Sequence, residues 1–158
     1  MTEQDLEKTC IGVIKLACPG AYVWKIHDLV TGGQPDLEVN WNGATTKIEF
    51  KVLKRDESIH QKWEDARQLI TCVRYEVQTG RCWVVAYRKA DRRVNRAEAT
   101  FIYRPTKLLD GKVPTPFQWE FSEHVGYRFS DRLWQTGVIQ LSGFAHHAVA
   151  TLIRQTHL

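Results

Sequence analysis

Two neighbouring segments with alternating hydrophobic and polar residues constrain the fold of this chain most strongly. Leu37–Trp41 and Thr45–Leu53 both alternate, and the Asn42-Gly43 dipeptide between them is a strong signal for a tight turn. The pattern predicts an antiparallel β-hairpin. On its second strand the hydrophobic side chains should face one side of the sheet and the charged side chains the other.

The elements around this hairpin predict the order α-β-β-β-α-β. The expected helices span residues 2–17 and 57–78, and the expected strands span 21–27, 37–41, 45–53 and 81–88. Thr2 can cap the first helix, with Asp5 completing a short capping box. The second helix should bury one stripe, formed by Ile59, Trp63, Ala66, Ile70, Val73 and Val77.

The remaining residues read as an extension of this core. A basic loop at 89–97 precedes a strand near Thr100–Arg104, an irregular aromatic stretch at 105–135, an apolar strand at Val138–Leu141 and a helix at Gly143–Gln155. With 158 residues the chain suits a single domain, with a core of about 3–88 and an extension of 98–158. The sequence predicts an α/β (α+β) fold with a mixed central sheet.

Composition excludes several classes of protein. The apolar runs are far shorter than the ~20 residues that span a bilayer, and the acidic N-terminus does not resemble a secretory signal. The four cysteines contain no C-x-x-C pair, which argues against a zinc knuckle. We therefore expect a reduced, cytoplasmic protein without a membrane segment.

Positive charge is concentrated in residues 81–107. This block contains Arg81, Arg88, Lys89, Arg92, Arg93, Arg96, Arg104 and Lys107 against only Asp91 and Glu98. Residues 1–50 are acidic in balance. A basic block beside an acidic cluster suggests a polyanion on one side and a metal cation on the other, although a solvated basic loop would look the same.

Three residues of the hairpin point to chemistry. Asp36 opens the first strand and Glu49 lies on the second, so the tight turn can bring their carboxylates together, and Lys51 leaves the same face as Glu49. Two neighbouring carboxylates repel unless a cation lies between them, and Mg²⁺ binds through one or two carboxylates, waters and substrate phosphates. A lysine beside that cation can orient a water and stabilise a charged phosphate, as phosphodiester hydrolysis requires.

These residues resemble the PD-(D/E)xK nuclease superfamily, in particular the VRR-type nucleases of phages and repair enzymes, which are similar to Holliday-junction resolvases. Gly33-Gln34-Pro35-Asp36 matches the Gly-x-Pro-Asp motif of that group, Glu49-Phe50-Lys51 its Glu-x-Lys motif, and Gln61 a glutamine near the start of the next helix. The resemblance covers about residues 3–88. It implies a restriction-endonuclease-like αβββαβ core, here followed by strands and one helix, and a phage or bacterial origin.

The resemblance also implies roles for these residues. Asp36 and Glu49 would bind Mg²⁺, or Mn²⁺ as a substitute, with the backbone carbonyl of Phe50 as a further ligand. Lys51 would act on the attacking water, and Gln61 would orient a phosphate, the lysine or a water.

The family also has an acid on its first helix, for which Glu7 and Glu3 are both candidates. Glu7 is favoured because apolar residues follow it at helical spacing, and Glu3 is the second choice. Either acid could instead stabilise the helix N-terminus.

The expected function is Mg²⁺-dependent hydrolysis of DNA by an endonuclease that selects DNA structure, such as a branch or flap, rather than sequence. A homodimer would suit a four-way junction. The candidate phosphate contacts are Lys54, Arg55, Arg88, Lys89, Arg92, Arg93 and Arg96. The alternative is a non-catalytic DNA-binding or partner-binding protein on a nuclease-like scaffold. A third interpretation is an interaction protein in which the Glu-x-Lys pattern is accidental.

Overall fold

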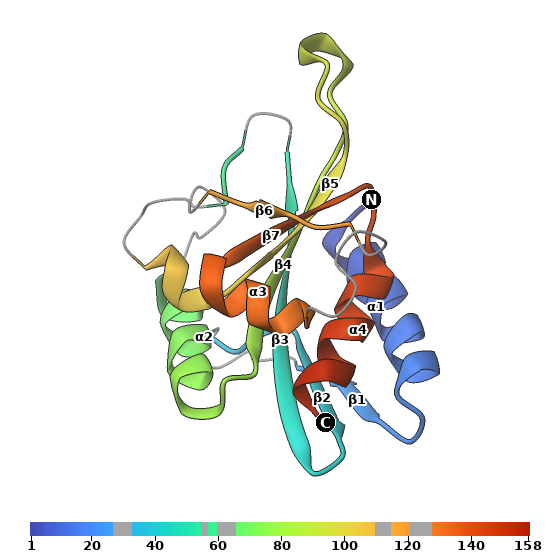
Figure 1. Cartoon of the computed structure of the whole chain (residues 1–158), viewed down its shortest axis with the longest axis vertical. Coiled ribbons are helices and arrows are strands. Elements are labelled where there is room, and N and C mark those ends of the chain that lie inside the picture. Colours follow the sequence, from blue (N-terminus) through green and yellow to red (C-terminus); the bar gives the residue numbers. More distant parts are fainter. Residues whose placement is uncertain (27–32, 55–56, 60–65, 110–114, 121–127) are drawn as a thin grey trace.

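Seven strands form one mixed sheet, in the order β1-β2-β3-β4-β5-β7-β6 (Figure 1). The structure is a computed structural model that describes residues 1–26, 33–54, 57–59, 66–109, 115–120 and 128–158. The strands are β1 (Tyr22–Lys25), β2 (Leu37–Trp41), β3 (Ala44–Leu53), β4 (Cys82–Arg88), β5 (Ala99–Tyr103), β6 (Phe117–Gln118) and β7 (Val138–Ser142). The helices are α1 (Glu3–Ala17), α2 (Ala66–Thr79), α3 (Phe129–Thr136) and α4 (His146–Thr156), with short 3-10 turns η2 (Arg92–Val94) and η3 (Pro105–Leu108). The predicted mixed α/β fold is confirmed, whereas its assignment to the nuclease core and its extent as a single domain stay predictions.

The β2–β3 hairpin forms as its sequence predicts. Asn42 and Gly43 have φ angles of 50° and 75°, the two positive values that a type I′ hairpin turn requires. The strands pair antiparallel from Trp41 opposite Ala44 to Leu37 opposite Ile48. On its other edge β3 pairs parallel with β4, and α2 lies in the connection between these two strands. The carboxyl ends of β3 and β4 therefore lie at the same end of the sheet.

Helices cover both faces of the sheet and create two hydrophobic clusters. The larger cluster joins α1 and α4 to the sheet face that contains Ile48 and Phe50. The smaller one includes Leu53 and Val84 and lies on the face that α2 covers. The predicted alternation along β3 is confirmed, but its charged face packs against a helix rather than facing water. Thr2 and Asp5 form the predicted capping box at the start of α1.

The predicted buried stripe of the second helix is wrong in part: Ile59 is buried, Trp63 lies outside the described residues, and other members are exposed. Ile70 is 42% exposed and Val77 is 72% exposed, whereas Cys72 and Glu76 are buried. Residues 57–59 are not helical, and the described part of the helix begins at Ala66. The hydrophobic pattern misled because the inward face of α2 contains a charged residue, Glu76.

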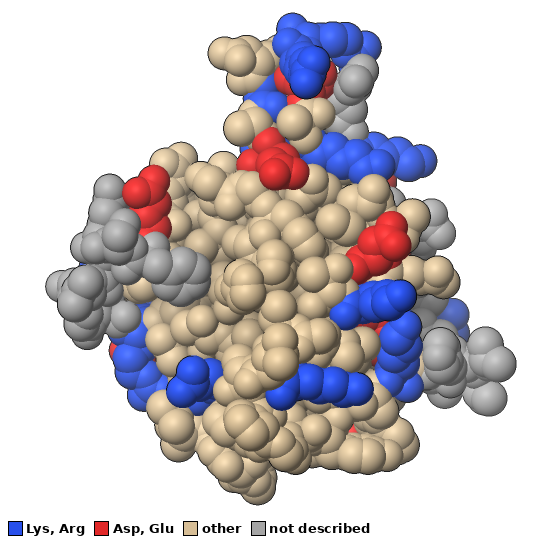
Figure 2. Space-filling view, turned by 90° about the vertical axis from the view of Figure 1, so that its right-hand side faces the viewer, with Lys and Arg blue, Asp and Glu red and all other residues tan. Residues whose placement is uncertain are grey.

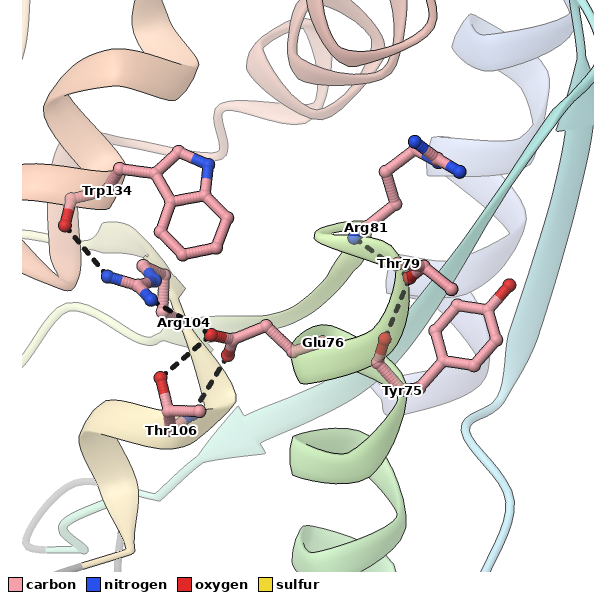
Figure 3. A network of polar contacts seen from close by, with 7 residues as sticks. All are labelled: Tyr75, Glu76, Thr79, Arg81, Arg104, Thr106 and Trp134. Atoms are coloured by element: carbon pink, nitrogen blue, oxygen red, sulfur yellow. Dashed lines mark hydrogen bonds and ion pairs between the residues drawn. The ribbon is translucent and has the colours of Figure 1, made fainter.

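Glu76 is buried because a set of donors surrounds its carboxylate (Figure 3). Arg104 Nη2 donates to Glu76 Oε2 at 3.1 Å, and Thr106 donates to both oxygens, from its backbone N–H at 2.9 Å and from its hydroxyl at 2.8 Å. The Arg104 guanidinium also lies 3.6 Å from the centroid of the Trp134 ring and donates to the Trp134 carbonyl. These contacts tie α2 to η3 and α3.

The C-terminal residues extend the sheet and complete one of its faces. The predicted strands near 100–104 and 138–141 and the predicted last helix are present as β5, β7 and α4. The interpretation of 105–135 as irregular is wrong in part, since this stretch contains η3, β6 and α3. Trp119 within it is buried against Phe129, as expected for a packing residue.

Two further findings bear on the expected class of protein. The described helices include none with the length and apolar character of a membrane span. All four cysteines, namely Cys10, Cys18, Cys72 and Cys82, are free and buried, which fits their expected role as small hydrophobic residues.

Candidate active site

Asp36 and Glu3 meet the edge of β3 where its partner strand has ended. The first residue of β2, Leu37, lies opposite Ile48, so β2 does not pair with the part of β3 that follows Ile48. The N–H groups of Phe50 and Val52 on this edge are therefore open to side chains. Asp36 Oδ2 accepts a hydrogen bond from the Phe50 N–H at 2.9 Å, and Glu3 Oε1 accepts one from the Val52 N–H at 3.4 Å. The Phe50 carbonyl points to the same edge as its N–H, toward Asp36, because both groups of a strand residue face one side. This orientation supports its predicted role as a ligand.

Glu49 and Lys51 lie beside this edge, on the face that α2 covers. Glu49 is 1% exposed and Lys51 is 8% exposed. The Lys51 ammonium lies 3.0 Å from Glu49 Oε1 and donates to Gln68 Oε1, also at 3.0 Å. Gln68, in the first turns of α2, therefore holds the ammonium from the opposite side of the site.

The electrostatic environment raises the pKa of both hairpin carboxyls. Burial, reinforced by the negative charge of Asp36, raises the pKa of Glu49 to about 8, although Lys51 opposes this shift. Burial also raises the pKa of Asp36, and the charge of Glu3 acts in the same direction. The hydrogen bond from Phe50 N–H and the charge of Lys51 lower it. Because the charge of Asp36 disfavours ionisation of Glu49, a cation between the two carboxylates would stabilise the ionised pair.

The donor set fits a hard divalent cation better than zinc. The second oxygen of Glu49, Oε2, is buried and has no hydrogen-bond partner among the described residues. In the part of the chain that the structure describes, no three His, Cys, Asp or Glu side chains are grouped to hold a metal. Mg²⁺ requires only one or two carboxylates, with waters and substrate phosphates completing the shell. Asp36, Glu49 and the Phe50 carbonyl satisfy that requirement.

The structure distinguishes the two acids of the first helix. Glu3 reaches β3 and is close enough to Asp36 to raise its pKa. The Glu7 carboxylate lies 3.9 Å from the ammonium of Lys25. The geometry thus favours Glu3, the second choice of the sequence interpretation.

Other predicted site residues have different outcomes. Gln61 and Arg55 lie outside the described residues, so their roles stay predictions. Gln68 is the glutamine seen at Lys51, and the sequence interpretation missed it because the wrong helical stripe was selected for α2. A stripe with a charged member, through Gln68, Cys72 and Glu76, was the signal that could have found it.

Close packing against α2 explains why the Gly-x-Pro-Asp segment has a glycine at position 33. It is buried against α2, and a Cβ at this position would lie 3.2 Å from Thr71 Oγ1 and 3.6 Å from the Arg67 carbonyl oxygen. A larger residue would push the segment that positions Asp36 away from the helix that positions Gln68.

Four of the predicted phosphate contacts lie on a projecting arm, whereas Arg88 ends β4 and the exposed Lys54 follows β3. The chain between β4 and β5, residues 89–98, extends from the sheet as the basic arm (Figure 1), and Figure 2 shows Lys and Arg side chains on it. Its exposed cations are Lys89, Arg92 and Arg93. Asp91 fixes the tip, because its side chain accepts from Arg93 N–H at 3.1 Å and its backbone pairs with Arg96. The arm leaves the same end of the sheet that bears Glu49 and Lys51.

Comparisons with known proteins give no family assignment. No protein-family model matches this chain, and no curated protein matches its sequence. The relation to PD-(D/E)xK nucleases therefore stays a prediction.

The raised pKa of Glu49 predicts that Mg²⁺ binding strengthens with pH. Between about pH 4.5 and 8 the metal-free native state holds a proton that the unfolded chain has lost, so metal-free stability should fall as pH rises through this window. A Mg²⁺ ion held by Glu49 would compete with this proton for the carboxylate. Its apparent affinity should increase about tenfold per pH unit up to pH 8.

This prediction can be measured as the rise in Tm caused by Mg²⁺ at pH 6.5 and pH 8.5. The rise should be clearly larger at pH 8.5 for the wild type, and independent of pH for Glu49→Gln. Equal shifts of the wild type at both pH values would show that Glu49 does not exchange a proton for the metal.

Proposed function

We propose that this protein is a Mg²⁺-dependent nuclease that hydrolyses phosphodiester bonds of DNA. The observation that supports it most strongly is the convergence of Asp36, Glu49 and Lys51 at one edge of the sheet. A buried acid and a partly buried acid beside a buried ammonium are costly to maintain in a fold that has no use for them. A divalent cation and a phosphate would balance these charges.

Each side chain has a distinct task in this mechanism. Asp36 and Glu49, with the Phe50 carbonyl, would hold the cation, which when bound acidifies water and offsets negative charge on the phosphate. Lys51 would orient the attacking water and stabilise charge that develops on the phosphate in the transition state. Gln68 is a positioning residue, since it fixes the ammonium of Lys51.

The basic arm supplies the affinity for DNA in this proposal. Cations that contact phosphates give binding that depends on salt and is independent of sequence. An arm that projects from the body suits DNA whose strands diverge, so we extend the proposal to branched or flapped substrates. A homodimer would place two such sites on a four-way junction.

The direct test incubates the protein with supercoiled, linear, single-stranded and branched DNA in Mg²⁺, Mn²⁺ or EDTA. We expect cleavage with either metal and none in EDTA. Cleavage that persists in EDTA would contradict the metal-dependent mechanism. DNA binding with no cleavage under any condition would instead support a non-catalytic binding protein on the same scaffold.

Exchanging the two acids of α1 tests which of them belongs to the site. Glu3→Gln should reduce cleavage about 10- to 100-fold, since its charge lies beside Asp36, while the amide retains the hydrogen bond to Val52. Glu7→Gln is the matched control and should change the rate less than about threefold, because Glu7 pairs with Lys25. Loss of cleavage in Glu7→Gln alone would restore Glu7 as the helix acid.

A further inference from the structure

A pocket of about 320 Å³ lies at the base of the basic arm, next to the carboxyl ends of β3 and β4. Arg88 and Arg96 line it from either end of the arm, and Phe101 and Tyr103 line it from β5. The two aromatic rings lie 6.0 Å apart and are stacked. Glu57 also lines the pocket, and its Oε2 accepts a hydrogen bond from the Lys54 N–H. Among the described lining residues, two guanidiniums thus face one carboxylate.

Arg88 has the contacts of a cation that is oriented but not neutralised. Its Cζ lies 5.1 Å from the centroid of the Phe101 ring, and its Nη2 donates to the Ala97 carbonyl at 3.3 Å. Its Nε is buried without a hydrogen-bond partner, and none of the described carboxylates forms an ion pair with it. Burial, and then the charge of Arg96, lowers the pKa of Arg88. An anion bound here would accept a hydrogen bond from the Nε of Arg88 and would offset the repulsion between the two guanidiniums.

The pocket is within reach of a strand that occupies the candidate active site. Leu53 on β3 pairs in register with Arg88 on β4, and Glu49 lies four residues before Leu53. At about 3.3 Å per residue, the two sites are roughly 13 Å apart along the strands. One nucleic-acid strand can span this distance with only a few nucleotides.

We propose that this pocket binds a phosphate group of the substrate strand through Arg88 and Arg96, and so fixes where the cut falls. The guanidinium of Arg88, whose Cζ lies 5.1 Å from the centroid of the Phe101 ring, has the forked donor geometry that matches a phosphate. The inference rests on the proposed function only for the identity of the strand. The phosphate is either an internal one or the terminal 5′-phosphate, and both have the same chemistry.

Binding in EDTA tests the pocket without any cleavage. Fluorescein-labelled oligonucleotides of one sequence, with a 5′-phosphate or a 5′-hydroxyl, are titrated with wild type, Arg88→Gln and Arg96→Gln. Each variant should bind about tenfold or more weakly. Arg154→Gln is the matched control, since it removes one exposed arginine from α4 and should cost no more than about threefold.

The two sources of phosphate give different patterns. If the wild type prefers the 5′-phosphorylated strand and Arg88→Gln abolishes that preference, the pocket holds a strand end. If Arg88→Gln weakens both strands equally and more than Arg154→Gln does, it holds an internal phosphate. Equal losses in Arg88→Gln, Arg96→Gln and Arg154→Gln would overturn the proposal, because only general charge would then matter.

Two controls separate this outcome from failure of the nuclease proposal. Arg88→Lys retains the charge and loses the fork, so it should bind with intermediate affinity, and thermal unfolding of each variant reports on its fold. Lys47→Ala, which removes a lysine that contacts Gln34 and the Tyr75 ring, should bind the oligonucleotides as the wild type does. Phosphate binding that depends on Arg88, without cleavage in Mg²⁺, would reject the nuclease function and leave the pocket in place.

Discussion

Lys51→Ala should lower the rate of Mg²⁺-dependent DNA cleavage by about 100- to 1,000-fold. The ammonium is buried at 3.0 Å from both Glu49 Oε1 and Gln68 Oε1, so it has one position from which it can act on a water or a phosphate. Removing one preorganised group that stabilises developing charge typically costs this much in kcat. Single-turnover cleavage of a labelled duplex or branched substrate measures the effect.

The control for this variant is Lys47→Ala, which removes a lysine from the same strand and face. Lys47 lies 4.7 Å from the Tyr75 ring centroid and donates to Gln34, so both of these contacts are with neutral groups. Its loss should change cleavage less than about threefold. Wild-type rates in Lys51→Ala, or equal losses in the two variants, would show that Lys51 is not part of the chemistry.

The same variant also separates metal binding from catalysis. Asp36 and Glu49 remain in Lys51→Ala, so Mg²⁺ should still raise its Tm at pH 8.5. A variant that has lost cleavage but retains the metal-dependent shift would assign Lys51 to the chemical step. Loss of both would assign it to assembly of the site.

Glu76→Ala should destabilise the protein by about 3 to 5 kcal/mol, more than any surface substitution on α2. The change leaves the Arg104 guanidinium and the Thr106 N–H without their carboxylate partner in a buried position. Breaking one side of a buried ion pair typically has this cost. For a chain of this size the midpoint of thermal unfolding should fall by roughly 10 °C.

Two comparisons make this stability prediction specific. Gln78→Ala removes an exposed side chain from the same helix and should change stability by less than about 0.5 kcal/mol. In a double-mutant cycle, Arg104→Ala should cost much less when Glu76 is already alanine, because the two residues share one interaction. Additive effects would mean that the ion pair does not stabilise the contact between α2 and η3.

The hairpin could be predicted from sequence because every local signal there agrees. The period of two, the Asn42-Gly43 turn and the position of Asp36 all specify one register, and that register alone brings Asp36 to the edge of β3. A one-residue slip would have reversed the faces of Glu49 and Lys51. The central part of the candidate site therefore follows from local patterning.

The contribution of α2 could not be predicted because its inward face depends on partners far away in sequence. Glu76 is buried only because Arg104 and Thr106 come from a segment that lies nearly thirty residues later. The spacing of hydrophobic residues does not reveal such a contact. It therefore predicted that Ile70 and Val77 would be buried, whereas both are exposed. The same error concealed Gln68.

The sequence could not decide between Glu3 and Glu7 for a similar reason. Apolar spacing identifies the packed face of α1, and Glu7 does lie near it, beside Cys10. What selects Glu3 is the unpaired edge of β3 beyond the end of β2, a feature of how two elements meet rather than of either sequence.

Because β2 pairs with β3 only as far as Ile48, Asp36 and Glu3 bind the backbone of β3 beyond that residue. Each carboxylate accepts a hydrogen bond from a β3 N–H that β2 does not pair with, and the Asp36 carboxylate is also a proposed ligand of the cation. Truncation to alanine at either position would remove the hydrogen bond to β3 together with the negative charge. Only the isosteric amides, Asp36→Asn and Glu3→Gln, keep the backbone anchored and thus isolate the loss of charge from the loss of shape.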